Sequence, residues 1–265
     1  MDRAFFIKLF RLTKDFVKEL FEPKISFYAA SMSWATLFFI IPLLVIVFSV
    51  ILHTPVFKEY YQSIHTLIAN YLVPTNSKVV MDFIDNFVTN ASKIGVIGLI
   101  YVIIAAIFFF RDFDYIVNDI FEEKRRSLLR TITLYGALLI FLPIFIALSF
   151  WLYLFIAKQF AIANYLLQFF IFWAVTAIIY KVTPKDKIST KIALLSSFIA
   201  TTVWFLAKSI FILYILYNKT YTTIYGTISI IMFMFLWIYI SWAIFIHGLK
   251  FCDLLNKDEE IESIS

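Results

Sequence analysis

Two long apolar runs in the second half of the chain, residues 192–217 and 226–251, restrict the possible folds more than any other feature. An α-helix rises about 1.5 Å per residue and the hydrocarbon core of a bilayer is about 30 Å thick, so about 20 apolar residues are needed to cross it. Both runs reach this length. The first contains a lysine far from either end, Lys208, whose charge must be compensated at that depth.

The composition agrees with a protein built into a membrane. Of the 265 residues, 62% are hydrophobic, 20% are aromatic and only 15% are charged, which lies far outside the range of soluble domains. The chain is therefore predicted to be one integral membrane unit. Its one cysteine, Cys252, leaves no intrachain disulfide to consider.

The apolar pattern predicts an all-α polytopic membrane protein. Residues 1–24 have the spacing of an amphipathic helix in the plane of the membrane, and residues 53–92 that of two short amphipathic helices outside its core. Residues 253–265 form an acidic tail. The membrane domain, residues 25–252, contains six predicted transmembrane helices, at 25–52, 93–110, 132–157, 161–180, 192–217 and 226–251. Pro42 and Pro143 are expected to kink the helices that contain them, because proline removes a backbone hydrogen bond.

The distribution of basic residues predicts the orientation. Seventeen lysines and arginines flank the spans on the side of the two termini and five lie on the opposite side. Positively charged flanks stay in the cytoplasm, so both termini are predicted to be cytoplasmic and residues 53–92 external.

Three separated segments carry a family resemblance. They are Tyr28 to Leu43 (YAASMSWATLFFIIPL), Arg111 to Ile120 (RDFDYIVNDI) and Trp204 to Gly226, which includes Lys208 and Tyr221. In these segments the chain resembles the YihY/BrkB family of bacterial inner-membrane proteins, over roughly residues 20–252. The resemblance implies six helices with cytoplasmic ends, and family members have been labelled ribonuclease BN or virulence factor. It also marks Arg111, Asn118 and Gly226 as motif positions.

This chain departs from the family pattern at two places where relatives often have an acidic residue. Phe205 occupies one of them, and the segment Gly248-Leu249-Lys250 occupies the other. A charge network built on those carboxylates would therefore be changed here.

Enzymatic chemistry is not favoured. A nuclease needs converging metal-binding carboxylates or a histidine with a second acid or base. The three histidines, His53, His65 and His247, are predicted on opposite sides of the membrane. The carboxylates between Asp112 and Glu123 lie close to Lys124, Arg125 and Arg126, which is typical of a solvated helix face, and Phe113, Ile116, Ile120 and Phe121 are interpreted as a surface stripe. No metal or cofactor site and no nucleic-acid partner is expected.

The favoured interpretation is a protein of the bacterial cytoplasmic membrane that transports or handles a lipid or other amphiphilic anion in envelope maintenance. The alternative is a non-catalytic scaffold of an envelope complex; a tRNA-processing nuclease of the ribonuclease BN type is disfavoured. Partners would be membrane lipids, other envelope proteins or a second copy of the chain. The candidate ligand-binding residues are Lys208, Ser33, Thr36, Tyr221 and Tyr225.

Each candidate also has a structural interpretation. Small hydroxyl residues such as Ser33 and Thr36 permit close helix packing, and the two tyrosines fit an interfacial belt. Lys208 could be compensated by carbonyls and hydroxyls, including the Phe38 carbonyl freed by Pro42. It could also extend to the headgroups, or bind an anionic ligand.

Overall fold

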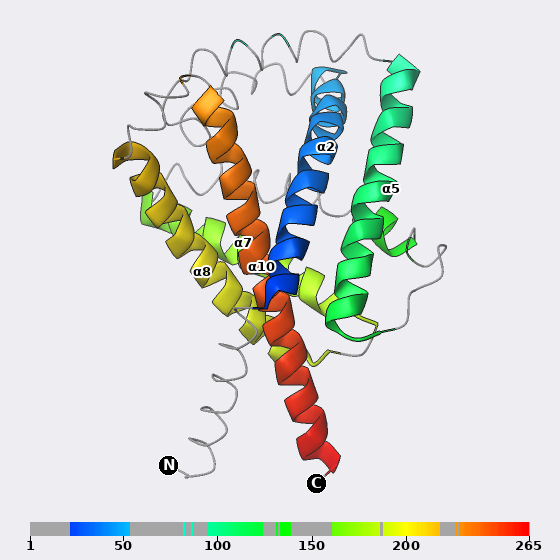
Figure 1. Ribbon diagram of the computed structural model, residues 1–265, viewed down its shortest axis with the longest axis vertical. Helices are drawn as coiled ribbons and strands as arrows, with labels where there is room; N and C mark the ends of the chain where they lie inside the picture. Colours follow the sequence, from blue (N-terminus) through cyan, green and yellow to red (C-terminus); the bar gives the residue numbers. More distant parts are fainter. Residues whose placement is uncertain are drawn as a thin grey trace. The chain divides into compact units, whose positions relative to one another are not determined.

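The structure, a computed structural model, describes residues 22–53, 95–123, 133–138, 161–185, 188–217 and 228–264, with the single residues Asp82, Asn86, Thr131 and Gly226. Its elements are all helices (Figure 1): α2 (Pro23–His53), α5 (Gly95–Ile120), α7 (Ala161–Val182), α8 (Thr190–Tyr217) and α10 (Ile228–Ile264). No strand occurs in these parts of the chain. The predicted all-α class is confirmed.

Local chemistry explains where these helices begin and end. Pro23 opens α2, where its missing N–H is not needed by the helix. Pro184 follows the end of α7 and prevents its continuation. Before α10, Gly226 adopts a φ of 54°, and its carbonyl accepts hydrogen bonds from the backbone N–H and the hydroxyl of Ser229.

Two helices, α5 and α10, extend far beyond the predicted spans. Residues 95–110 of the predicted span 93–110 are part of α5, which continues to Ile120. The predicted acidic tail is also helical, because α10 does not end near residue 251 but continues to Ile264. Ion pairs at helical spacing, Lys250 with Asp253 and Asp253 with Lys257, support this continuation.

The structure describes only some of the residues on which the two predicted proline kinks and the remaining predicted segments depend. Backbone helix continues through Pro42, where no side chains are described. Pro143 lies outside the described residues, as do residues 1–21, nearly all of 53–92 and most of 132–157.

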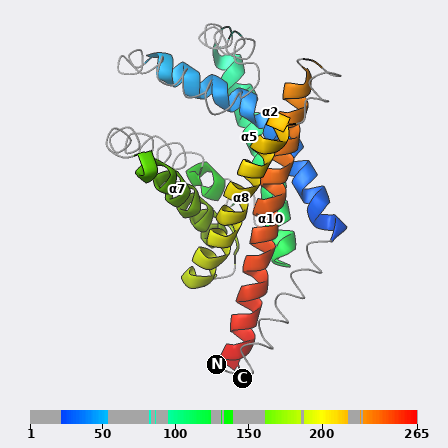
Figure 2. The same cartoon turned by 90° about the vertical axis from the view of Figure 1, so that its left-hand side faces the viewer.

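The chain divides into two compact units. Unit 1 comprises residues 1–32, 110–211 and 239–265, and unit 2 comprises residues 33–109 and 212–238. In unit 1, α8 lies beside α10 (Figure 2) and α7 packs on α8. The most completely buried large side chains of unit 1 include Met32, Ile116, Tyr135, Tyr180, Ile246 and Leu249.

Aromatic contacts organise unit 2. The rings of Phe39 and Phe109 stack with centroids 4.9 Å apart, and Trp34 stacks on Phe235 at 6.4 Å. Tyr214 meets Phe233 edge to face, and Phe233 is buried. Helices α2, α5, α8 and α10 thus contribute to this unit through ring packing.

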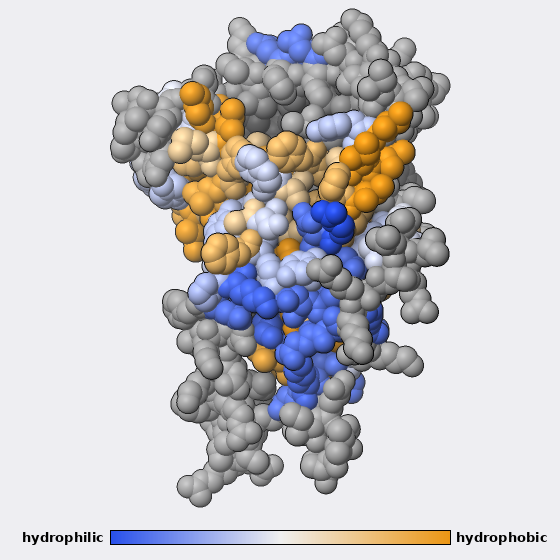
Figure 3. All heavy atoms as spheres, turned by 45° about the vertical axis from the view of Figure 1, so that its right-hand side comes forward, coloured by the Kyte–Doolittle hydropathy of each residue, from blue (hydrophilic) through white to orange (hydrophobic). Residues whose placement is uncertain are grey.

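Much of the apolar surface remains exposed, as a membrane helix requires. The exposed fractions are 60% for Leu206 and 67% for Ile210, both on α8. Figure 3 shows a face of the molecule that carries both exposed apolar side chains and a gathering of hydrophilic ones. Among the described residues, α8 and the apolar part of α10 are long enough to cross a bilayer, and Leu166–Val182 is a shorter apolar helix.

Candidate functional site

Lys208 lies in the unit 1 part of α8, and two aromatic rings of its own helix receive its charge. Its ammonium is 5.8 Å from the ring centre of Trp204 and 5.8 Å from that of Phe205. These residues precede it by four and three positions, so helical periodicity puts them under the lysine. A cation over an aromatic face is attracted by the negative face of the ring system.

Neighbouring helices fix the position of the Trp204 ring. Its indole N–H donates a hydrogen bond of 3.0 Å to the hydroxyl of Ser241 on α10. Phe172 of α7 stacks on the ring with centroids 4.4 Å apart and planes inclined by 20°. The ring therefore forms a rigid support for the lysine.

The lysine retains hydrogen-bonding capacity in this arrangement. Its side chain is half-buried, and no carboxylate of the described residues forms an ion pair with it. An ammonium has three N–H donors, and attraction to a ring face does not occupy them as a carboxylate would. The aromatic support is a form of compensation that the residue types alone did not predict.

The other candidate ligand residues lie in unit 2 or outside the described residues. Ser33 is buried and Thr36 half-buried, and both belong to unit 2. Tyr221 and Tyr225 lie outside the described residues. Their grouping with Lys208 stays a prediction.

A second polar centre of unit 1 lies inside the protein, around Asp114. This carboxylate is 8% exposed and Asn118 is 3% exposed. The Asn118 amide donates to the Asp114 carboxylate at 2.8 Å and to its backbone carbonyl at 2.6 Å. Tyr135 donates its hydroxyl to the same carboxylate at 3.1 Å. The carbonyl oxygen of the Asn118 side chain has no hydrogen-bond partner in the part of the chain that the structure describes.

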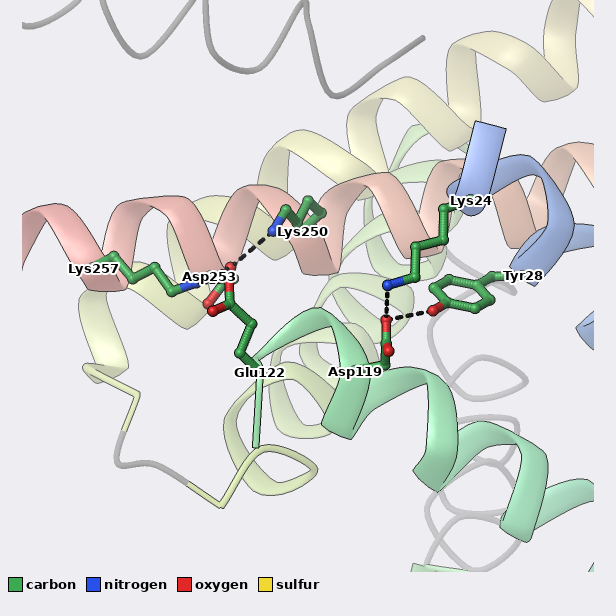
Figure 4. Close-up of polar contacts among 7 residues, drawn as sticks. All are labelled: Lys24, Tyr28, Asp119, Glu122, Lys250, Asp253 and Lys257. Carbon is green, nitrogen blue, oxygen red and sulfur yellow. Dashed lines mark hydrogen bonds and ion pairs between the residues drawn. The ribbon is translucent and has the colours of Figure 1, made fainter. Parts of the chain in front are cut away.

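Asp119, on the same helix, joins α5 to α2 (Figure 4). Its carboxylate lies 2.6 Å from the Lys24 ammonium and accepts a hydrogen bond from the Tyr28 hydroxyl. Burial acts to raise the pKa of Asp119, but hydrogen bonds from Lys24 and Tyr28 outweigh it and hold this pKa below its ordinary value. Asp119 is thus ionised and shared between two donors.

The end of α5 meets α10 through a row of charges. Lys257 lies 2.8 Å from Glu122 and 3.2 Å from Asp253, and Asp253 lies 3.2 Å from Lys250 (Figure 4). The hydrogen bond from Lys257 lowers the pKa of Glu122. Asp253 is 2% exposed, so two lysines stabilise a carboxylate that would otherwise be costly to bury.

The interpretation of residues 112–123 as a solvated face with a surface stripe is wrong for Asp114 and for the apolar stripe, whereas Glu122 is exposed. Asp114 and Asn118 are buried, and the presumed stripe lies in the core: Phe113, Ile116, Ile120 and Phe121 are each no more than 6% exposed. The apolar residues were spaced for a helix face, and Asp114, Val117 and Asn118 fall on that same face. This periodicity could have indicated a buried polar pair in the sequence. The basic residues nearby favoured a solvated face instead.

The structure also describes the other two positions that the family resemblance marked, Arg111 and Gly226. Arg111 is exposed and lies 3.8 Å from Asp112. Gly226 supplies the positive φ before α10. Gly248 packs against Tyr180 of α7 and Ala200 of α8, and Lys250 forms an ion pair with Asp253. Within the described residues, no group of three or more His, Cys, Asp or Glu could hold a metal ion.

Comparison with known proteins places the chain among bacterial membrane proteins. The UPF0761 membrane protein of Haemophilus influenzae (strain 86-028NP) is 28% identical over 258 residues, which cover 93% of this chain and 96% of the relative. A UPF0761 membrane protein of Mannheimia succiniciproducens is 27% identical over 251 residues, covering 91% of this chain and 88% of the relative. These names indicate no enzymatic activity, and no solved structure matches the chain.

The family model described as virulence factor BrkB matches residues 16–263. The expected resemblance is confirmed over nearly the whole chain, and this membrane protein belongs to the BrkB family.

Proposed function

We propose that this protein binds and moves an amphiphilic anion, with a phospholipid as the favoured class, and that Lys208 receives the anionic group. The observation that carries the proposal is a half-buried lysine in an apolar helix, supported by two rings and without a carboxylate partner among the described residues. An unpaired cation in such a helix is costly, and a bound phosphate would offset that cost.

The surroundings of Lys208 suit a ligand with both a charge and an apolar chain. Phe205 and Phe211, three residues before and after it on α8, lie on the same side of the helix as Lys208 and are apolar and half-buried. An acyl chain could lie against such residues while its phosphate accepts hydrogen bonds from the ammonium. Neither a metal nor a catalytic step is part of this proposal. We place the protein in the bacterial cytoplasmic membrane with both termini in the cytoplasm, as the basic residues predict.

Retention of lipid by the purified protein tests the proposal. Wild type and the variants Lys208→Met, Lys208→Arg and Lys191→Met are purified from one lipid source, and bound phospholipid is counted per protein by mass spectrometry. Lys191 is an exposed lysine on the same helix and is the matched control. We expect Lys208→Met to lose the retained anionic lipid, Lys208→Arg to keep part of it and Lys191→Met to behave as wild type.

Added lipid distinguishes binding from the scaffold alternative. Each protein is reconstituted in nanodiscs of phosphatidylcholine with or without phosphatidylglycerol, and enrichment of the anionic lipid around the protein is measured. Equal retention and equal enrichment for wild type and Lys208→Met would refute an anion site at Lys208 and leave the scaffold interpretation standing.

A further inference from the structure

Glu122 has a backbone conformation that is unfavourable for its residue type. Its φ is 55°, and it is the one non-glycine residue with a positive φ in the described parts of the chain. It ends α5 in the left-handed conformation that glycine usually adopts there, with the N–H of Glu123 bonded to the carbonyl of Asn118 at 2.7 Å. A residue with a Cβ is strained in this position, so another interaction must offset the strain of Glu122.

The contact of the Glu122 side chain with α10 offsets this strain. The left-handed conformation carries the Glu122 carboxylate to Lys257, 2.8 Å away and 135 residues later in the sequence. The next residue, Glu123, accepts two hydrogen bonds from the backbone N–H of Lys185, at 2.7 and 2.9 Å, which anchors the end of α5 to the segment after α7. The Glu122 side chain thus reaches α10 from a fixed base.

The charge row has a permanent inner part and an outer part that can open at low cost. In the inner pair the side chains are 15% exposed for Lys250 and 3% for Asp253, whereas in the outer pair they are 42% exposed for Lys257 and 74% for Glu122. Salt screens exposed pairs strongly and buried pairs weakly. Lys257 also remains paired with Asp253, four residues before it on α10, when its ion pair with Glu122 opens.

We propose that the Glu122–Lys257 ion pair is a releasable clasp that holds the C-terminal part of α10 against the end of α5, and that increased ionic strength opens it. Opening leaves no buried charge unpaired, because Asp253 retains both lysines, and it frees Glu122 from its strained conformation. The inner pair remains closed, so the movement is confined to α10 beyond Asp253. The clasp does not involve Lys208 or the residues that support it.

The distance between α7 and the end of α10 tests the clasp. Spin labels are attached at Val182→Cys and Glu259→Cys in the full-length protein, since both positions are exposed and Cys252 is fully buried. Distance distributions are measured by pulsed electron resonance at low and high salt. We expect one short distance at low salt and a growing longer one at high salt.

Three substitutions in the labelled protein make the test specific. Glu122→Gln and Lys257→Gln should each raise the ratio of open to closed populations at low salt by about 1.5- to 5-fold, the range for an exposed ion pair. Asp112→Asn, which removes an α5 carboxylate paired within its own helix, should not. A wild-type distribution that is insensitive to salt, or clasp variants that match Asp112→Asn, would overturn the proposal. Size-exclusion profiles identical to wild type establish that each variant is folded.

Discussion

Replacing Gly248 by alanine should destabilise unit 1 by crowding three helices. A Cβ at this position on α10 would meet the Tyr180 hydroxyl of α7 and would lie 2.6 Å from the Cβ of Ala200 on α8. Carbon atoms in van der Waals contact lie about 3.5–4.0 Å apart, so one helix must move. Tyr180 is fully buried and donates to the Phe245 carbonyl at 2.6 Å, so it cannot turn away without losing that bond.

The expected magnitude follows from three contributions. Overpacking a filled interior costs about 1–3 kcal/mol, and losing the Tyr180 hydrogen bond costs a further 0.5–1.5 kcal/mol or so. Alanine gains roughly 0.8–1 kcal/mol over glycine inside a helix. Gly248→Ala should therefore lower the free energy of unfolding by about 0.5–4 kcal/mol.

The measurement is equilibrium unfolding in mixed micelles of a mild detergent and sodium dodecyl sulfate. Gly136→Ala is the matched control, because a Cβ there meets nothing within 4 Å and should be neutral or stabilising by up to about 1 kcal/mol. Adding Tyr180→Phe and Ala200→Gly to Gly248→Ala removes both obstructing atoms and should recover part of the loss. If Gly248→Ala is no less stable than Gly136→Ala, the close packing of α7, α8 and α10 described above is refuted.

Two further predictions concern charge. The pKa of Asp119 is held below its ordinary value of 3.8, so its contribution to stability is present above that value and disappears as the pH falls through the lowered one. Unfolding midpoints measured from about pH 6 to about pH 3 should therefore fall less for Asp119→Asn than for wild type, and parallel curves would contradict this. A cysteine introduced at Lys185 should resist impermeant thiol reagents in intact cells and react after lysis; labelling from outside would refute the predicted orientation.

The sequence by itself determined that this is an all-helical membrane protein, because the length and apolarity of 192–217 and 226–251 leave few alternatives. It also located Lys208 as an unusual cation, since charge within an apolar run is visible without a structure. The segments quoted from Tyr28 to Gly226 identified the family, and the match to residues 16–263 confirmed it.

Only the tertiary structure decided which polar residues lie inside and what they contact. Asp114 looks solvated beside Lys124 and Arg125, yet it is buried together with Asn118 because their face of α5 packs into unit 1. The support of Lys208 depends on Ser241 and Phe172 fixing the Trp204 ring, and these residues come from helices distant in sequence. The contact between Glu122 and Lys257 spans 135 residues. The local pattern of the sequence determines where helices form and how long their apolar runs are. Burial and charge pairing depend instead on which helices meet in the folded protein.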